Sequence, residues 1–317
     1  MIKKIAVIDI GTYSTRLLIA SINTELPTEE KIKNIKTILS VGRITSLGRN
    51  LNKNGFLEEE AILETLKVLE EYVLISKEYR VEKIIAYATQ ACRIAKNGKD
   101  FLDKVRKLGI DVRLISGDEE AYLSFLATAY SINPEKSFIV IDQGGGSTEY
   151  AFGNKEEKEY RLINSISFPF GIVNLTEKFI HSDPPEKKEL EEMSDFIKEK
   201  IKEAKKIMPA EILIGLGGTI TTLVALEYNI YPYDSSKVHG KILSYSSIKF
   251  WLDKLSKMTI VERKKIPMVE DKRAEAIISG IVIFKTTLEV FEKESIIISD
   301  KGLRHGALIY EIVNDRL

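Results

Sequence analysis

Short apolar blocks bounded by turn residues alternate along the chain with segments whose apolar residues recur at i, i+3 and i+4. Residues 58–79 show the helical spacing clearly, with acidic residues in the first turn. For the first part of the chain the pattern predicts strands at 5–8, 16–23 and 33–39, a helix at 58–79, a strand at 83–88, a helix at 95–107, a strand at 112–115 and a helix at 119–130.

The same order of elements starts again after the sequence Ser131-Ile132-Asn133-Pro134. The pattern there predicts strands at 138–141, 149–152 and 160–168, helices at 172–180 and 186–206, a strand at 211–216, a helix at 220–228, an irregular and helical stretch to residue 294, a strand at 295–298 and a last helix. The order βββ-α-β-α-β-α therefore recurs with insertions, which indicates a duplicated α/β unit with a cleft between its copies.

The repeat is also visible in the letters, because VIDIGTYST at residues 7–15 and VIDQGGGST at 140–148 share Val, Ile, Asp, Gly, Ser and Thr at equivalent positions. We expect domains at 1–130 and 131–317, with a last helix at 302–317 that packs back on the first domain. A chain of 317 residues also exceeds the size at which one hydrophobic core usually stops growing.

Charge and cysteine content narrow the functional classes. Lys plus Arg and Asp plus Glu are 47 each, so no net field favours nucleic acid or an anionic membrane, and neither is expected as a partner. The single cysteine, Cys92, allows no internal disulfide and fits a cytoplasmic protein, and no zinc-ligand spacing is present. The N-terminal segment resembles neither a signal peptide nor a membrane span.

Both copies carry D-x-G-x-x-S-T between two strands, which is the pattern that would hold a phosphate. Glycine lets backbone amides approach an anion without a Cβ in the way, and hydroxyl groups add donors. The residues concerned are Asp9, Gly11, Thr12, Tyr13 and Ser14 in the first copy, and Asp142, Gly144, Gly145, Gly146 and Ser147 in the second. The aspartate would hold Mg²⁺ beside the phosphate oxygens, whereas a single such loop could equally be a turn without ligand.

A third glycine segment, Gly217-Gly218-Thr219, opens a helix after a strand and could meet a phosphate or a nucleoside. For Gly215 close helix–strand packing is as good an explanation. The segment Asp118-Glu119-Glu120 supplies acids to the first turn of a helix, and one of them is a candidate general base for water.

Further candidates are Thr89 and Arg93, at a helix start after a strand, and Arg43, among turn residues. Each arginine taken alone is more typical of a surface ion pair than of a ligand. Cys92 is expected to be a small core residue, and His239 and His305 to have structural or surface roles.

Nine segments in order, among them YATQACR, ISGDEEA, VIDQGGGSTEY, GLGGTITTL and SDKGLRHGAL, resemble the exopolyphosphatase and guanosine pentaphosphate phosphatase family. The resemblance covers essentially the whole chain. It implies two ribonuclease H-like domains around a cleft, as in sugar kinases, actin and heat-shock ATPases, and Mg²⁺-dependent removal of the terminal phosphate of polyphosphate or guanosine pentaphosphate, the latter giving the tetraphosphate alarmone.

The resemblance also implies roles for residues. Glu120 would activate water, Asp142 would hold the metal, and Glu149 would lie near the metal or the water. Arg93 would contact the phosphate chain, and residues 217–219 would form the nucleotide-side loop. His305 stands where the family often has glutamate, which removes a carboxylate near the domain junction. Longer relatives have further helical domains after the point where this chain ends, so processive action on long chains is not implied.

Two other hypotheses remain open from the sequence. A small-molecule or sugar kinase of the same superfamily would release ADP in the presence of a sugar without free phosphate. A non-catalytic alarmone sensor would bind guanosine penta- or tetraphosphate without turnover. A homodimer is compatible with the sequence, and the preference between polyphosphate and guanosine pentaphosphate does not follow from it.

Overall fold

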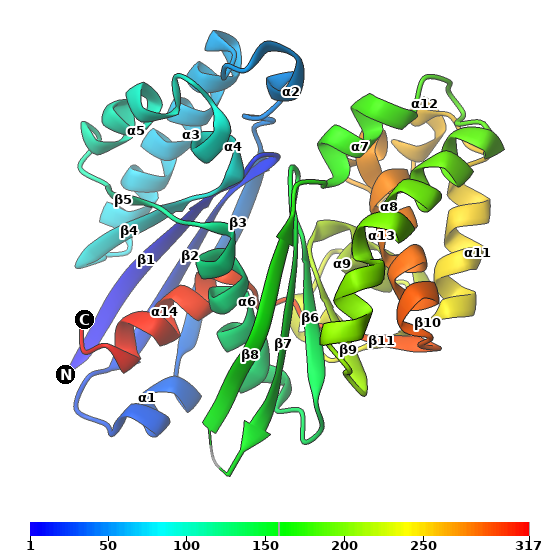
Figure 1. The fold of residues 1–317 in the computed structure, drawn as a ribbon. Helices are drawn as coiled ribbons and strands as arrows, with labels where there is room; N and C mark the ends of the chain where they lie inside the picture. The colour runs from blue at the N-terminus through cyan, green and yellow to red at the C-terminus, as the bar shows by residue number, and fades with distance from the viewer. Residues whose placement is uncertain (158, 317) are drawn as a thin grey trace. The chain divides into compact units, whose positions relative to one another are not determined.

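A computed structural model describes residues 1–157 and 159–316, and the chain in it divides into two compact units (Figure 1). Unit 1 comprises Met1–Tyr130 and the segment that starts at Leu303, and unit 2 comprises Ser131–Gly302. The chain thus passes between units after Tyr130 and returns after Gly302. Both positions lie at the boundaries expected from the repeat, with the last helix in unit 1; residue 317 of the predicted helix lies outside the described residues.

Unit 1 is built on a five-stranded sheet in the order β3-β2-β1-β4-β5, in which β1, β2 and β3 are antiparallel and β4 and β5 run parallel to β1. Its elements are β1 (Ile2–Ile10), β2 (Ser14–Asn23), α1 (Thr28–Lys33), β3 (Lys36–Ile44), α2 (Leu51–Asn54), α3 (Glu59–Glu78), β4 (Lys83–Ala88), α4 (Gln90–Ile94), α5 (Gly98–Arg106), β5 (Asp111–Leu114), α6 (Gly117–Ile132) and α14 (Leu303–Val313).

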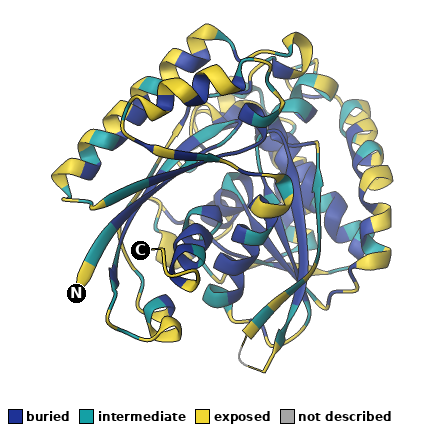
Figure 2. Ribbon diagram, turned by 60° about the vertical axis from the view of Figure 1, so that its left-hand side comes forward, coloured by how far each residue is buried: buried dark blue, intermediate teal, exposed yellow. Residues whose placement is uncertain are grey.

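Successive side chains of a strand point to opposite faces of the sheet, so each face has its own set of apolar side chains. Helices cover both faces. Ile8 and Ile10 of β1 belong to a core with α3 and α5, whereas Ile5 and Val7 belong to a second core with α6 and α14. Figure 2 shows the resulting distribution, with buried central strands, more exposed edge strands and helices whose outer faces are exposed. Helix α14 therefore completes the unit in which the chain begins.

Unit 2 repeats this plan in a six-stranded sheet with the order β10-β11-β9-β6-β7-β8. Its elements are β6 (Phe138–Gln143), β7 (Thr148–Glu156), β8 (Glu159–Phe168), α7 (Ile172–Phe179), α8 (Lys187–Ile207), β9 (Ile212–Leu216), α9 (Gly218–Glu227), α10 (Ser235–Val238), β10 (Ile242–Ser244), α11 (Tyr245–Leu255), α12 (Ile260–Arg263), α13 (Arg273–Phe291) and β11 (Ser295–Ile298).

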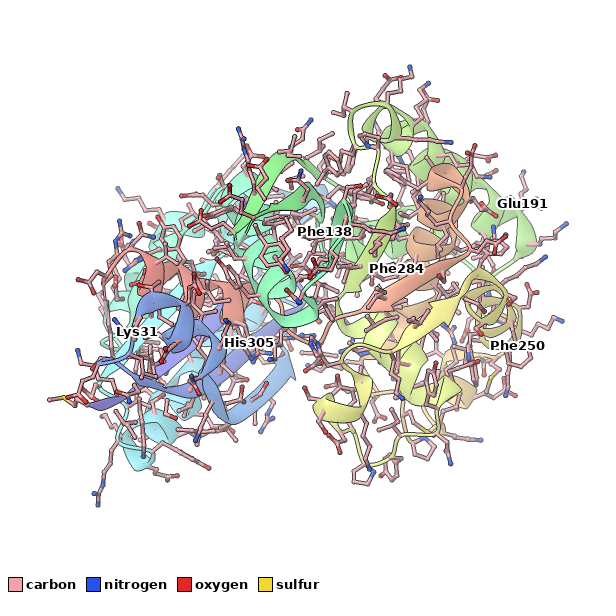
Figure 3. All side chains as sticks on the ribbon, turned by 90° about the horizontal axis from the view of Figure 1, so that it is seen from below. Lys31, Phe138, Glu191, Phe250, Phe284 and His305 are labelled. Carbon is pink, nitrogen blue, oxygen red and sulfur yellow. The ribbon has the colours of Figure 1, made fainter. Side chains whose placement is uncertain are left out.

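Strands β8-β7-β6-β9-β11 follow one another in the same order and directions as β3-β2-β1-β4-β5, and β10 is added at the edge. The duplication read from the sequence is therefore confirmed in the topology. Phe138 of β6 and Phe284 of α13 are fully buried in this unit, and the exposed Phe250 of α11 lies at its outer side (Figure 3).

Three local predictions were wrong. Lys33 ends helix α1, and strand β3 starts at Lys36. The helix predicted at 95–107 is α5, which starts only at Gly98, and a separate short helix, α4, precedes it; the two pack so closely that a Cβ on Gly98 would lie 2.0 Å from the carbonyl oxygen of Cys92. The stretch before residue 294 contains the edge strand β10, whose three residues are too few to show an alternating pattern.

Among the described residues, no helix is both long enough and apolar enough to cross a membrane.

Candidate active site

The two D-x-G-x-x-S-T segments form loops with the same backbone geometry. In the first loop, residues 11–14, the amide of Gly11 donates to the carbonyl of Ser14 at 3.0 Å; in the second loop, residues 144–147, Gly144 donates to Ser147 at 3.0 Å. A Cβ on Gly11 would lie 2.9 Å from the Ser14 oxygen, and one on Gly144 would lie 3.0 Å from that of Ser147. The first glycine of each loop is therefore required, because the carbonyl oxygen at the end of the same loop lies where a Cβ would be.

The start of helix α7 holds the second loop in place through hydrogen bonds to the loop's carbonyl groups. Gly144 accepts from the amide of Ile172 at 3.1 Å, and Gly145 accepts from that of Val173 at 2.7 Å. The side-chain amide of Asn174 donates to the Gly146 carbonyl at 2.8 Å. Gly171 packs against the same backbone, since a Cβ there would lie 2.5 Å from the carbonyl carbon and oxygen of Gly145.

This anchoring orients the amides of the loop. In a planar trans peptide the N–H of one residue points opposite to the C=O of the residue before it. The amides of Gly145, Gly146 and Ser147 therefore point away from α7, and in the described part of the chain they donate to no backbone carbonyl. Three successive amides with this orientation form an anion-binding nest.

The first loop is anchored in the same way by residues 45–48. The Thr12 carbonyl accepts from Gly48 at 2.8 Å, and the Tyr13 carbonyl accepts from Thr45 at 3.1 Å and Ser46 at 2.9 Å. The amides of Tyr13 and Ser14 are thereby directed away from this segment. The buried Thr12 side chain packs on Gly48, which accounts for a non-glycine residue at a position that is glycine in the second loop.

The two copies differ in the residue opposite the aspartate. Asp142 is the register partner of Glu149 on the antiparallel strand β7, whereas Asp9 is the partner of Arg16 on β2. Residues directly opposite in an antiparallel pair project from the same face, so the second copy places two carboxylates together and the first a carboxylate with a guanidinium.

The carboxylate pair of the second copy suits a divalent cation. Glu149 is 1% exposed, and its Oε1 accepts a hydrogen bond from Ser167 Oγ at 2.7 Å. Hard carboxylate oxygens are the ligands Mg²⁺ prefers, and one or two of them with substrate phosphates and water are its usual set. Two carboxylates are a donor set that suits an ion shared with a phosphate. Among the described residues there is no group of three or more His, Cys, Asp or Glu side chains that could hold a metal ion.

Two neighbouring acids in the first turn of helix α6 have different surroundings. Glu119 is exposed and forms a capping box, because its Oε2 accepts from the Ser116 amide at 2.7 Å and its own amide donates to Ser116 Oγ at 3.1 Å. Glu120 is buried, and its Oε2 lies 3.9 Å from Nη1 of Arg93. Arg93 Nη1 in turn donates to the Ile115 carbonyl at 2.6 Å, which fixes the guanidinium at the start of α6.

Thr89 lies at the end of β4 beside the first loop. Its amide donates to the carbonyl of Ile10, the last residue of β1, at 3.2 Å, and its side chain is buried. Unit 1 therefore brings together two groups of candidates, Thr89 with the first loop and Arg93 with Glu120.

Arg43 does not lie in a turn as predicted, because it belongs to strand β3. Its Nη2 is 3.1 Å from Oε1 of Glu71, and the side chains of both residues are about half exposed. The turn residues Thr45 and Ser46 follow it. The placement matches the surface ion pair that the sequence allowed for this arginine.

Packing explains much of the third glycine segment. Gly217 has φ +111°, and a Cβ there would lie 2.6 Å from the Gln143 carbonyl oxygen. A Cβ on Gly218 would lie 2.1 Å from Nη1 of Arg273, which contacts the start of α9 and pairs with Glu270 at 3.3 Å. Thr219 is buried against Gly280. A ligand role for residues 217–219 stays a prediction.

Cys92 is 3% exposed, and burial raises the pKa of its thiol to about 12. The thiol is therefore neutral at ordinary pH, in agreement with a core residue. His305 is buried on α14, with Nε2 3.3 Å from Thr37 Oγ1 of β3.

Comparison with known proteins gives consistent results. The model of the Ppx/GppA phosphatase family matches residues 26–315. A crystal structure of the Aquifex aeolicus member of that family is 46% identical, with all of both chains covered and a TM-score of 0.83.

Two curated relatives add to this. Exopolyphosphatase 2 of Mycobacterium tuberculosis is 31% identical over 92% of both chains. A bifunctional 3-dehydroquinate synthase/phosphatase of Fusobacterium nucleatum is 36% identical over 98% of this chain, which spans 46% of that protein's length. The α/β fold with two mixed sheets is thus the actin-like fold of solved relatives.

Proposed function

Because the chain belongs to the Ppx/GppA phosphatase family, we propose that it is a Mg²⁺-dependent phosphoanhydride hydrolase that removes the terminal phosphate of inorganic polyphosphate, guanosine pentaphosphate or both. The observation that carries the proposal is the second loop, where the amides of Gly145, Gly146 and Ser147 point away from α7 beside the register pair of Asp142 and Glu149. An anion nest next to two carboxylates suits a phosphate that shares a divalent cation with the protein.

The chemistry assigned to the residues is direct attack by water. The water oxygen forms a bond to the terminal phosphorus, the bridging P–O bond breaks, and the shortened chain leaves with the bridging oxygen. Glu120 takes a proton from the water, and the loop amides and Arg93 stabilise the charge on the phosphoryl oxygens. Asp142 and Glu149 would hold Mg²⁺, which neutralises phosphate charge when bound.

Neighbouring acids on α6 allow a matched test. Phosphate release from polyphosphate and from guanosine pentaphosphate is measured for the wild type, Glu120→Gln and Glu119→Gln, with and without a chelator. We expect Glu120→Gln to lower kcat by about 10²–10⁴-fold, the usual contribution of a general base. Glu119→Gln should stay close to the wild type, because glutamine also completes a capping box.

A Glu120→Gln variant that kept its rate within about threefold would contradict the proposed base. Sugar-dependent ADP release from ATP without free phosphate would instead favour a kinase. Tight alarmone binding without turnover of either substrate by the wild type would favour a sensor. The ratio of kcat/KM for the two substrates, from one preparation, measures the preference.

The name of the mycobacterial relative supports polyphosphate as the first substrate to be tried.

A further inference from the structure

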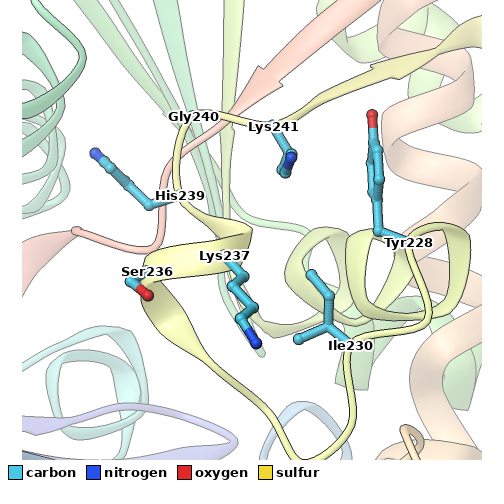
Figure 4. A pocket seen from close by; sticks show the side chains of 7 residues that line it. All are labelled: Tyr228, Ile230, Ser236, Lys237, His239, Gly240 and Lys241. Carbon is cyan, nitrogen blue, oxygen red and sulfur yellow. The ribbon is translucent and has the colours of Figure 1, made fainter.

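Unit 2 contains a pocket of about 540 Å³ that none of the proposed catalytic residues lines (Figure 4). It is bounded by the end of α9, by α10 and by the segment that leads into β10. A volume of this size falls within the range of small-molecule sites, about 300–1,000 Å³.

The lining combines cationic and apolar groups. Lys237 and Lys241 are exposed, whereas Ile230 is 8% exposed and supplies an apolar surface. The Lys241 ammonium lies 4.9 Å from the centre of the Tyr228 ring, whose hydroxyl donates to the Ile242 carbonyl at 2.9 Å. Lys237 is 3.7 Å from Asp234, on the helix turn before it.

The wall between the two lysines is anchored to the sheet. The amide of Gly240 donates to the Ile298 carbonyl at 2.8 Å, and the Ile298 amide donates to the Lys241 carbonyl at 2.8 Å. Gly240 has φ +80°, a conformation that favours glycine, so the turn has a defined shape. The backbone of Lys241 is therefore held against strand β11, and Lys237 lies on helix α10.

His239 adds a second anchor. Figure 4 shows its ring directed away from Lys237 and Lys241. Its Nδ1 accepts from the Asp300 amide at 3.3 Å, and its Nε2 lies 3.4 Å from the Ser131 carbonyl. Ser131 and Asp300 lie next to the two positions where the chain passes between units.

We propose that this pocket is a binding site for a nucleoside phosphate, with the phosphate at Lys237 and Lys241 and the nucleoside against Tyr228 and Ile230. Lysine ammonium groups bind phosphate as point charges, and an aromatic ring beside an apolar side chain accommodates a planar base. The phosphate replaces Asp234 as partner of Lys237. The proposal does not depend on the hydrolytic function, because no residue is shared.

The test uses AMP and GMP as probes, since neither contains a phosphoanhydride bond. Isothermal titration calorimetry of the wild type is expected to give saturable binding with one site per chain. The double variant Lys237→Gln/Lys241→Gln should weaken binding about tenfold or more, which corresponds to about 1.4 kcal/mol. Thermal unfolding checks that this variant folds.

Lys254→Gln is the matched control, because Lys254 is also exposed and lies 4.8 Å from the centre of an aromatic ring, that of Trp251, outside the pocket. It should bind AMP and GMP like the wild type. The variants Glu120→Gln and Asp142→Asn should also keep the affinity, which places the probe away from the proposed catalytic groups.

Absence of saturation at millimolar AMP and GMP would overturn the proposal, as would equal affinity in the double lysine variant. Loss of binding in Asp142→Asn would indicate that the probe binds at the second loop, and this would also overturn the proposal. Inorganic phosphate and the free nucleosides form separate arms, and each should bind more weakly than the monophosphate. Phosphate that bound as tightly as AMP would contradict the role of Tyr228 and Ile230.

Discussion

At the scale of single residues, burial and bonding separate groups that look alike in the sequence. Glu119 and Glu120 are adjacent acids, but one caps α6 while the other is buried beside Arg93. The sequence predicted that an acid of this turn is an ordinary helix-start residue. Which of these acids faces the interior depends on how α6 packs, and this does not follow from the local sequence. The assignment of Glu120 as the base therefore came from the family resemblance.

His239 gives a prediction on pH. Burial lowers the pKa of this imidazole from its ordinary value of about 6.5; the bond to Ser131 and the charge of Asp300 act against this, and Lys301 adds to it. Below about pH 6.5 the unfolded chain therefore binds a proton that the folded chain resists. The stabilisation from His239 is complete above that pH and decreases as the pH falls.

We expect the unfolding midpoint of the wild type to drop between pH 7 and pH 5, and to drop less in His239→Gln. Denaturant unfolding at several pH values measures this. His181→Gln, which removes an exposed imidazole, is measured beside it as the control. Equal slopes for wild type and His239→Gln would contradict the linkage.

At the scale of elements, the second loop depends on a helix that follows it in the chain. The sequence identified the glycine loop, and it explained the glycines by approach of a phosphate. The structure adds that Gly144 and Gly145 also meet the start of α7 and Gly171. Such a contact joins residues far apart in sequence, so no local pattern reveals it.

Gly171→Ala tests this contact. Its Cβ would lie 2.5 Å from the backbone of Gly145, which cannot move aside as a side chain could. We expect a loss of about 1–3 kcal/mol in the free energy of unfolding, typical of overpacking, together with reduced phosphate release. Denaturant unfolding and the hydrolysis assay measure the two effects.

Gly302→Ala is the control, since its Cβ would meet only Leu216 side-chain atoms, at 3.8 Å and 3.9 Å. The idea fails if both alanine variants unfold at the same denaturant concentration as the wild type.

At the scale of the whole molecule, the order of strands repeats while the helical insertions differ. The duplication could be predicted because apolar blocks recur in one order. Strand β10 and the division between α4 and α5 could not, since short edge strands and close helix contacts leave little periodic signal.

Helix α14 is attached to unit 1 by Glu311, a fully buried carboxylate. Its Oε1 accepts from Arg113 at 2.7 Å and from the Tyr87 hydroxyl at 3.4 Å, and its Oε2 is 3.5 Å from Lys83. Arg113 and Lys83 are each about one third exposed. When the charge of Glu311 is removed, these cations stay partly solvated, which limits the loss of folding stability.

We therefore expect Glu311→Gln to lower the free energy of unfolding by about 1–3 kcal/mol, measured by denaturant unfolding. Glu203→Gln is the matched control, because its ion pair with Lys206 is exposed and contributes at most about 1 kcal/mol. A Glu311→Gln variant as stable as this control would show that the charge of Glu311 is not needed to hold α14 in place.

The difference between Arg16 and Glu149 has one more consequence. Two equal halves would each offer a cation the same pair of acids, and a polymer of identical phosphates could then bind in either direction. With arginine opposite Asp9 and glutamate opposite Asp142, the halves are chemically unequal. Under the proposed function, a phosphate that shares a cation with the protein therefore belongs at the second loop, so a polymer without polarity of its own gains a defined head on the protein.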